Sequence, residues 1–277
     1  NLGDWSSDVC SSDLGITPSD LSRFARQGSG SACRSMFGGF VSWEMGSLAN
    51  GEDSVAVLVA EKEHWPEMQA LILVVSDKKK GTPSTAGMQR TVATSELLQH
   101  RIKHVVPTRM AAMETAIKAR DFDAFAQHTM ADSNQFHAVC LDTEPPIFYL
   151  NDVSRSIIAL VTEYNRASVA ASGHLKAAYT FDAGPNAVIY ALKDDVKPIL
   201  DLVLRYFPQS TPFPDPFGLQ PDATTPLVEG FNAAVIPVFA EGSVSRIIHT
   251  EVGDGPRVLA KEESLLGVDG FPKSLKQ

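Results

Sequence analysis

The sequence predicts an α+β fold, in which helices and strands are mixed in layers instead of alternating strictly. Short apolar runs rich in β-branched residues, which are typical of strands, occur in residues 40–76 and again in residues 176–252. Between them, residues 94–164 show the apolar spacing of amphipathic helices. A doubly wound parallel sheet would require strands and helices in alternation, so a layered α+β arrangement is favoured.

The first part of the chain predicts a short helix followed by strands. Ser19 or Asp20 is expected to cap a helix that continues through Leu21, Phe24 and Ala25. The glycine- and serine-rich residues after it predict a turn. Three apolar runs then predict strands, at residues 40–45, 55–60 and 71–76.

The middle of the chain is expected to be helical. The predicted helices cover residues 94–117, 121–140 and 150–164. Pro107 must begin a new helix or kink the first one, because proline lacks the N–H group that a helix interior needs. Pro145 and Pro146 are expected to end the second helix.

The last part returns to strands. Residues 176–181 and 187–192 predict two strands joined by a tight turn, and residues 196–206 predict an amphipathic helix. The proline-rich residues 207–228 predict an exposed loop. Two further strands are expected at residues 233–239 and 245–252, before a poorly ordered tail beyond Lys261.

The composition predicts a cytoplasmic protein with neither a membrane nor a nucleic-acid partner. The chain has 277 residues, of which 44% are hydrophobic and 21% charged, and no apolar run reaches the roughly 18 to 20 residues that span a bilayer. Three widely spaced cysteines, Cys10, Cys33 and Cys140, predict no disulfide framework. A net charge of −9 argues against a nucleic-acid surface but is compatible with a small anionic substrate.

The opening residues differ from the rest of the chain. Residue 1 is Asn, and Ser-Ser-Asp occurs twice before residue 15 without helical or strand periodicity. We interpret residues 1–15 as a leader foreign to the fold. The alternative is a disordered native loop.

No common nucleotide, hydrolase or metalloprotease motif is present. The glycine pair near residue 28 fails the dinucleotide pattern, because Cys33 stands where the third glycine belongs. The one metal-like set consists of His128, Asp132, His137 and Cys140. His128 and Asp132 share a helix face, but without a clear third ligand they are interpreted as ordinary polar helix surface, and no metal ligand is assigned.

Three short segments could bind or process an anion. Ser29 and Ser31 alternate with glycines ahead of Arg34, so backbone N–H groups, hydroxyls and a guanidinium could converge on an anion. Asp182 ends an apolar strand before a Gly-Pro turn, where a partly desolvated carboxylate can act as a base. Ser84 begins a helix after a lysine run, and a helix N-terminus favours anions. Taken singly, each segment is more typical of a surface loop, a turn or a solvated charge run.

Together, these segments resemble the diphosphomevalonate decarboxylases of the GHMP kinase superfamily. The similarity runs from about Ile16 to near the C-terminus. The matching stretches are residues 28–35 continuing through Gly38-Gly39-Phe40, residues 84–88, residues 132–137 and residues 179–187.

The resemblance implies an ATP-dependent decarboxylation of (R)-5-diphosphomevalonate to isopentenyl diphosphate, with ATP as co-substrate and Mg²⁺. It implies that Asp182 is the catalytic group at the 3-hydroxyl and that Arg34 holds the carboxylate. Ser29 and Ser31 would contact the substrate, with Ser31 at the diphosphate. Ser84 and Asn134 are further expected pocket residues. The resemblance also implies a homodimer in the cytoplasm that serves sterol and other isoprenoid synthesis.

The sequence departs from the family pattern at its beginning. The family's lysine-bearing strand and serine-rich ATP phosphate loop are not found here, so no residue is assigned to ATP. The expected organisation is a GHMP kinase-like pair of domains with a complete C-terminal domain. Residues 1–15 would form the leader, 16–65 a remnant of the N-terminal domain, 66–265 the C-terminal domain and 266–277 a tail. Such a chain is expected to bind ATP poorly and to show no turnover.

Two alternatives stay open at this point. A sister GHMP kinase, acting on phosphomevalonate or on the 3-hydroxyl of mevalonate, would transfer phosphate and stop. A non-catalytic, truncated product would only interact with the full-length enzyme.

Overall fold

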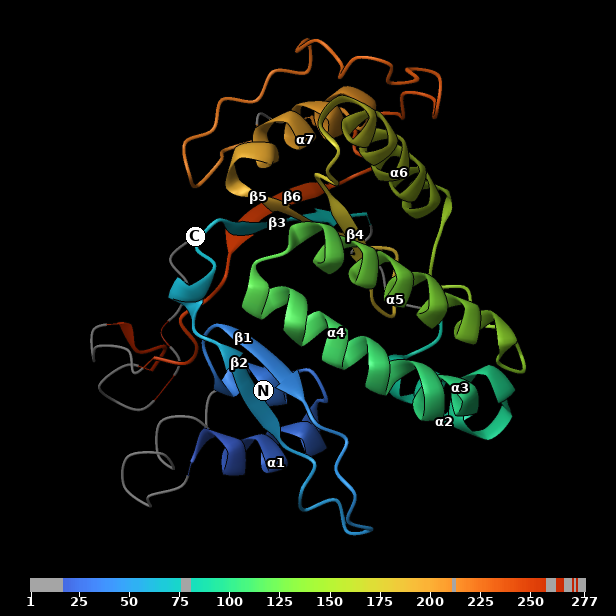
Figure 1. Cartoon of the computed structure of the whole chain (residues 1–277), viewed down its shortest axis with the longest axis vertical. Helices are drawn as coiled ribbons and strands as arrows, with labels where there is room; N and C mark the ends of the chain where they lie inside the picture. The colour runs from blue at the N-terminus through green and yellow to red at the C-terminus, as the bar shows by residue number, and fades with distance from the viewer. Residues whose placement is uncertain are drawn as a thin grey trace. The chain divides into compact units, whose positions relative to one another are not determined.

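The computed structural model describes residues 17–75, 81–210, 213–257, 263–266, Phe271 and Lys273. The predicted leader, the lysine run before Ser84 and most of the predicted tail lie outside the described residues. The chain divides into two compact units, one of residues 1–62 with 253–277 and one of residues 63–252 (Figure 1). The domain boundaries predicted from the sequence stay predictions.

The first unit is built from a helix and a hairpin. Its elements are α1 (Pro18–Gly28), the 3₁₀ turn η1 (Ala32–Met36), β1 (Phe40–Trp43) and β2 (Ala56–Ala60). The strands pair antiparallel with an irregularity at Phe40. The prediction that Ser19 or Asp20 caps α1 is wrong. Thr17 is the N-cap, and Asp20 completes a capping box by accepting from Thr17, because three residues separate the two.

The second unit holds a four-stranded antiparallel sheet. Its strands are β3 (Met68–Val74), β4 (Ala178–Phe181), β5 (Ala187–Leu192) and β6 (Arg246–Glu251), in the order β4-β5-β3-β6. Each pairing is antiparallel, with Leu71 opposite Ile189 on one side and His249 on the other. The predicted α+β class is therefore confirmed.

Seven helical segments accompany the sheet in the described part of the second unit, after the short turn η2 (Lys62–His64) where the units meet in sequence. They are α2 (Ser84–Thr94), α3 (Glu96–His100), the π-helical turn η3 (Arg101–Val105), α4 (Val106–Ala119), α5 (Phe122–Asp142), α6 (Asp152–Ser172) and α7 (Lys193–Tyr206). None of the described helices is both long and apolar enough to cross a membrane.

The single helix predicted for residues 94–117 is broken in the structure. Ser95 ends α2 and caps α3 by accepting a hydrogen bond from the Leu98 amide. A π-helical turn then leads into α4, where Pro107 occupies the first helical turn. The start of a new helix at Pro107 follows from its missing N–H, which costs nothing in a first turn.

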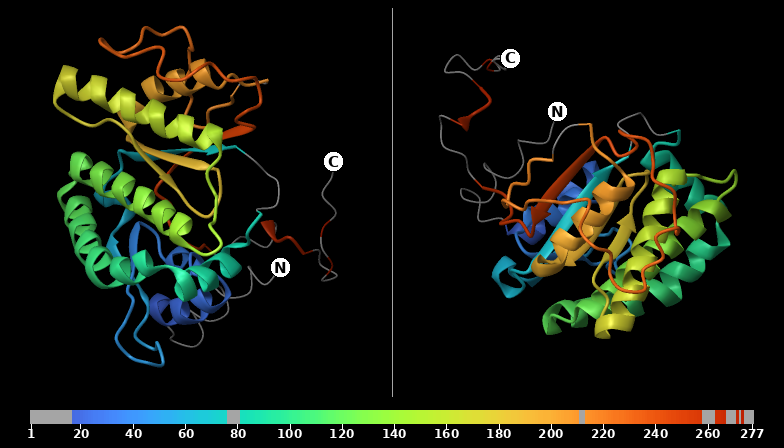
Figure 2. Two further views of the ribbon diagram at one scale, coloured as in Figure 1. Left: turned by 90° about the vertical axis from the view of Figure 1, so that its right-hand side faces the viewer. Right: turned by 90° about the horizontal axis from the view of Figure 1, so that it is seen from above.

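The helices form layers on the two faces of the sheet. In Figures 1 and 2, α6 and α7 cover one face, and α5 with α4 lies against the other. On the first face, Leu71, Leu73 and Ile189 are almost completely buried against Ile157 of α6 and Leu200 of α7. Burying each such side chain stabilises the fold by about 1.5 to 3 kcal/mol before entropic costs. This core anchors the strand ends that carry the polar residues described below.

The strand predicted at residues 233–239 is wrong. The segment forms turns, with the Val235 amide donating to the carbonyl of Asn232 and the Phe239 amide donating to the carbonyl of Tyr206 at the end of α7. Its apolar side chains pack against the α6–α7 core without joining the sheet. Pro237 has no N–H to donate to a neighbouring strand. An apolar run indicates that a segment is buried, but it does not show that the segment pairs with a strand.

Candidate functional site

In the first unit, a tight turn presents the serines of the Gly-Ser segment. The Ser29 amide closes α1 by donating to the carbonyl of Ala25 at 3.0 Å, and the carbonyl of Ser29 accepts from the Ala32 amide at 3.1 Å. This double use of Ser29 bends the chain so that the hydroxyls of Ser29 and Ser31 lie 3.2 Å apart. Both side chains are exposed, so the pair can address a ligand from solvent.

Close backbone packing supports the same region. The Gly39 amide donates to the carbonyl of Gly253 at 3.0 Å. Gly39 has φ +76°, and a Cβ there would lie 2.3 Å from the carbonyl oxygen of Ala60. A Cβ on Gly38 would lie 2.5 Å from the carbonyl oxygen of Asp254. Only glycine permits this approach, which brings residues 253–256 beside the loop.

These segments enclose an open hollow of about 620 Å³ in the first unit, lined by Ser31, Arg34, Ser35, Phe37, Gly39, Val41, Gly253, Gly255 and Pro256. Arg34 is exposed, and its guanidinium makes no hydrogen bond or ion pair with any described residue. Cys33 is fully buried, and burial raises the pKa of its thiol, which donates to the carbonyl of Gly30. The hollow therefore offers an unengaged cation and hydroxyls to an anion.

In the second unit, Asp182 projects from the end of β4. Phe181, directly before it, is buried in the core, whereas Asp182 is exposed. Its carboxylate makes no hydrogen bond with any described residue. The following turn is fixed, because the Ser154 hydroxyl donates to the carbonyl of Pro185 at 2.7 Å and the Val75 amide donates to Asn186 Oδ1 at 2.9 Å. A free carboxylate thus stands on a rigid support.

Helix α5 fixes the strand from which Asp182 emerges. Ser133 Oγ accepts the Phe181 amide at 3.1 Å, and Asn134 Oδ1 accepts the Tyr179 hydroxyl at 3.0 Å. One turn after Ser133, His137 is buried with its ring edge-on to Phe181 at 6.2 Å. Residues four apart share a helix face, so Ser133 and His137 act on the same strand residue.

His137 is held neutral by its surroundings. Burial lowers its pKa, and this effect exceeds the opposite effects of a hydrogen bond with the Phe181 backbone and of the charge of Asp182. Its Nε2 atom is buried without a hydrogen-bond partner among the described residues. Protonating that nitrogen would place an unpaired N–H and a charge in an apolar setting, which is strongly unfavourable.

The structure places the predicted site residues in two groups. Ser29, Ser31 and Arg34 belong to the first unit, and Asp182, Asn134 and Ser84 to the second. Within the first group, Ser31 and Arg34 line the hollow whereas Ser29 supports it from the preceding turn.

In the second group, Asn134 bonds to β4 close to Asp182, and Ser84 begins α2 after Pro83, whose position offers no side-chain cap. Sequence reasoning missed the support given by Ser133. The four-residue spacing of Ser133 and His137 within a matching stretch could have revealed it.

Asp132, a member of the metal-like set, pairs with two arginines. Asp132 accepts hydrogen bonds from Arg101 at 2.8 Å and Arg109 at 2.9 Å. Burial alone would raise the pKa of Asp132, but the bonds to both arginines hold it below its usual value. Among the described residues, no three His, Cys, Asp or Glu side chains are grouped to hold a metal ion.

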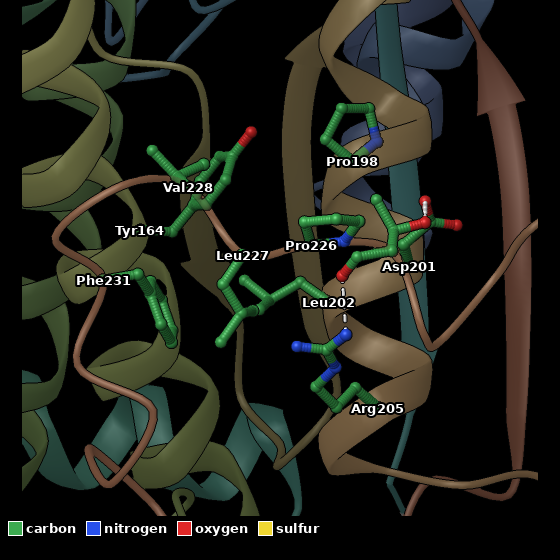
Figure 3. A pocket seen from close by; sticks show the side chains of 10 residues that line it. Tyr164, Pro198, Asp201, Leu202, Arg205, Pro226, Leu227, Val228 and Phe231 are labelled. Carbon is green, nitrogen blue, oxygen red and sulfur yellow. Dashed lines mark hydrogen bonds between the residues drawn. The ribbon is translucent and has the colours of Figure 1, made fainter.

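A second cavity, near α7, is too small for a substrate. Its volume is about 30 Å³, which suits a water molecule and little more (Figure 3). The Arg205 guanidinium at its edge donates to the carbonyls of Ala223 and Thr225, and the Thr225 hydroxyl donates to the buried Asp201 at 2.7 Å. The cavity therefore lies where these hydrogen bonds hold the proline-rich segment against α7.

Models of two protein families match the chain, one mainly in each unit. The family model for the mevalonate 5-diphosphate decarboxylase C-terminal domain matches residues 70–259, and that for the diphosphomevalonate decarboxylase-like N-terminal domain matches residues 8–56. The diphosphomevalonate decarboxylase of Ganoderma lucidum is 66% identical over 262 residues, which are 94% of this chain and 66% of that protein. The chain thus spans about two thirds of the length of this curated relative.

Solved structures show the same fold. The mevalonate diphosphate decarboxylase from Trypanosoma brucei matches with a TM-score of 0.79 and 38% identity, over 89% of this chain and 65% of that chain. A structure of MDDEF in complex with MVAPP, AMPPCP and magnesium matches with a TM-score of 0.61 and 31% identity, over 70% of this chain and 57% of that chain.

Proposed function

This chain belongs to the mevalonate 5-diphosphate decarboxylase family, with its GHMP-type fold, and from that premise we propose that it serves the decarboxylation of (R)-5-diphosphomevalonate. The products would be isopentenyl diphosphate, ADP, phosphate and CO₂. The observation that carries the proposal is the carboxylate of Asp182, which is exposed and unengaged on a rigidly held strand end. A side chain that acts on a substrate atom needs a rigidly held backbone and a functional group that is not already hydrogen-bonded within the protein.

Asp182 is assigned to the 3-hydroxyl of the substrate. Phosphoryl transfer needs mainly alignment and charge neutralisation, so a single carboxylate that accepts or orients the hydroxyl proton is chemically sufficient. Once the oxygen carries the phosphoryl group, phosphate leaves as the substrate carboxylate is lost as CO₂. The electron pair of the breaking C–C bond forms the new double bond.

The residues of the first unit are assigned to the anionic ends of the substrate. The free guanidinium of Arg34 suits a bidentate grip on the carboxylate, holding it until CO₂ departs. Ser31, which lines the hollow, is assigned to the diphosphate, and Ser29 to a supporting contact. Ser84 at the start of α2 and Asn134 beside β4 complete the proposed substrate residues.

ATP and Mg²⁺ are proposed as co-substrate and cofactor, since the MDDEF complex contains AMPPCP and magnesium. When bound, the ion would neutralise phosphate charge. No described group of three potential ligands fits a resident metal, so no residue or step of this chain is assigned to it. A homodimeric assembly and a cytoplasmic location are part of the same proposal.

Substrate binding tests the proposal directly. Calorimetric titration with (R)-5-diphosphomevalonate should show saturable binding to the chain, weakened roughly 10- to 100-fold by Arg34→Gln through loss of a charged hydrogen bond. Arg155→Gln is the matched control, because Arg155 is exposed and its guanidinium donates to the Leu150 carbonyl and to Asp152 at the start of α6. Absence of binding, or equal loss in both variants, would refute the assignment. Measuring CO₂ release with ATP would test the expectation that this chain alone shows no turnover.

A further inference from the structure

Tyr149 lies beside the turn that carries Asp182. It follows α5 and packs with Cys140 and Ile147 in a small apolar cluster, against which Ala183 also packs. The Ile147 amide donates to the carbonyl of Cys140 at 2.9 Å and fixes this segment on the end of the helix. Only 9% of Tyr149 is exposed, so the position of its ring is determined by the fold.

The hydroxyl of Tyr149 stands over the first turn of α2. A Cβ added to Gly87 would lie 2.5 Å from this oxygen, so only a glycine lets the hydroxyl approach the helix so closely. Gly87 is one turn after Ser84, where α2 begins. Tyr149 therefore connects two places that the proposed function assigns to substrate, the Asp182 turn and the start of α2.

This hydroxyl has no hydrogen-bond partner among the described residues. Two other buried tyrosines are satisfied, since Tyr179 donates to Asn134 and Tyr206 donates to the carbonyl of Ala233 at 2.8 Å. Buried phenol groups ordinarily find such a partner, whereas the ring of Tyr149 is buried and its oxygen still reaches solvent, where an incoming ligand can meet it. An unused donor that faces a helix start indicates a partner that arrives with the ligand.

Arg90 and the start of α2 favour an anion as that partner, against the opposing charge of Asp182. Burial, Cys140 and Asp182 raise the pKa of the phenol, while Arg90 acts in the opposite direction. The phenol therefore keeps its proton at neutral pH and is a donor. The helix dipole at the N-terminal turn of α2 and the nearby Arg90 both favour negative charge close to the hydroxyl.

We propose that Tyr149 binds substrate, its hydroxyl donating a hydrogen bond to an anionic oxygen held between Asp182 and the first turn of α2. The proposal rests on the function proposed above, which makes that anion part of diphosphomevalonate. A diphosphate oxygen and a carboxylate oxygen share the required chemistry.

Titration of three anions tests the proposal and identifies the oxygen. Wild type and Tyr149→Phe are titrated with (R)-5-diphosphomevalonate, with inorganic pyrophosphate and with (R)-mevalonate, which carries only the carboxylate. Removing a hydrogen bond to a charged group should weaken diphosphomevalonate binding roughly 10- to 100-fold. The weakening should recur with pyrophosphate if the oxygen is a diphosphate oxygen, and with mevalonate if it is a carboxylate oxygen. Tyr206→Phe is the matched control and should leave all three affinities unchanged.

The outcomes separate this inference from the proposed function. If diphosphomevalonate binds equally to wild type and Tyr149→Phe, Tyr149 is not a ligand and the function stands. If diphosphomevalonate does not bind but Tyr149→Phe weakens pyrophosphate binding, the substrate assignment fails while Tyr149 remains an anion ligand. If no anion binds the wild type, both proposals are overturned.

A double-mutant cycle with Gly87 tests the geometry independently. Gly87→Ala should displace the Tyr149 hydroxyl and weaken diphosphomevalonate binding in the wild type. In the Tyr149→Phe background the same change meets no hydroxyl, so it should cause no further loss. Equal losses in both backgrounds would overturn the proposed placement of the hydroxyl. Alanine is a better helix former than glycine, so folding of α2 should not confound the cycle.

Discussion

The two units present their proposed site residues in different ways. In the first unit, Ser29, Ser31 and Arg34 lie on a short turn, and close contacts between glycine backbones shape the hollow beside it. In the second unit, Asp182 lies at the end of a core strand, and side chains of two helices bond to the residues on either side of it. The first unit thus relies on the absence of side chains, and the second on specific polar partners.

This difference predicts which substitutions destabilise each unit. A glycine contact fails when any Cβ is added, because two backbones cannot occupy the same space. A polar support fails more gradually, because each lost hydrogen bond leaves one buried group unpaired. The Arg34 guanidinium and the Asp182 carboxylate make no hydrogen bond with any described residue, so replacing either side chain should leave folding nearly unchanged.

The largest expected effect is that of Gly39→Ala. The left-handed φ and the 2.3 Å approach to the Ala60 carbonyl together should destabilise the first unit by about 3 kcal/mol. Hydrogen exchange read by mass spectrometry should show faster exchange in β1 and β2 than in wild type. Gly28→Ala is the control, since nothing lies within 4 Å of its Cβ, and it should have little effect. If Gly39→Ala lowered the free energy of unfolding by less than about 1 kcal/mol, the close backbone contact would not explain why glycine stands at this position.

Ser133→Ala should have the next largest effect, in the second unit. It leaves the Phe181 amide without its acceptor, which should cost about 2 kcal/mol in urea unfolding and speed exchange of that amide. Ser172→Ala removes an exposed hydroxyl that bonds back to its own helix and should change stability by less than about 0.5 kcal/mol. Similar values for both variants would contradict the supporting role of α5.

Acidification should weaken the second unit through His137. Because burial depresses its pKa in the folded state, the unfolded chain takes up the proton first as pH falls below about 6.5. The stability that this histidine contributes is therefore present above that pH and is lost below it, by at most about 1.4 kcal/mol per pH unit. Urea unfolding between pH 7.5 and 5 would measure this effect, and His137→Gln should flatten the dependence. His104→Gln, at an exposed position, should retain it.

The smallest expected effect is that of Ser29→Ala on stability. The hydroxyl pair it breaks is exposed, so the free energy of unfolding should change by less than about 0.5 kcal/mol. Its effect on diphosphomevalonate affinity should be larger than its effect on stability. A variant that unfolds more easily without binding more weakly would show that Ser29 shapes the turn and does not contact substrate.

Most elements could be predicted because their signals are local. The apolar spacing of α5 and α6, the alternation of β5 and the Gly-Ser turn all express contacts within a few residues of sequence. Residues 233–239 could not be predicted in this way, since a buried turn and a strand have the same apolar pattern. The cap at Thr17 was missed because several capping residues stand together, and packing decides which one starts the helix.

The sequence by itself determined the α+β class, the family resemblance and the positions of Arg34, Asp182 and their neighbouring motifs. Only the tertiary structure decided that Asp132 pairs with Arg101 and Arg109, that Ser133 supports Phe181, and that the Tyr149 hydroxyl faces α2. The physical reason is the range of the interactions. Periodicity and turn chemistry act between neighbours in sequence, whereas hydrogen-bond partners and free donors are set by residues that folding brings together from distant parts of the chain.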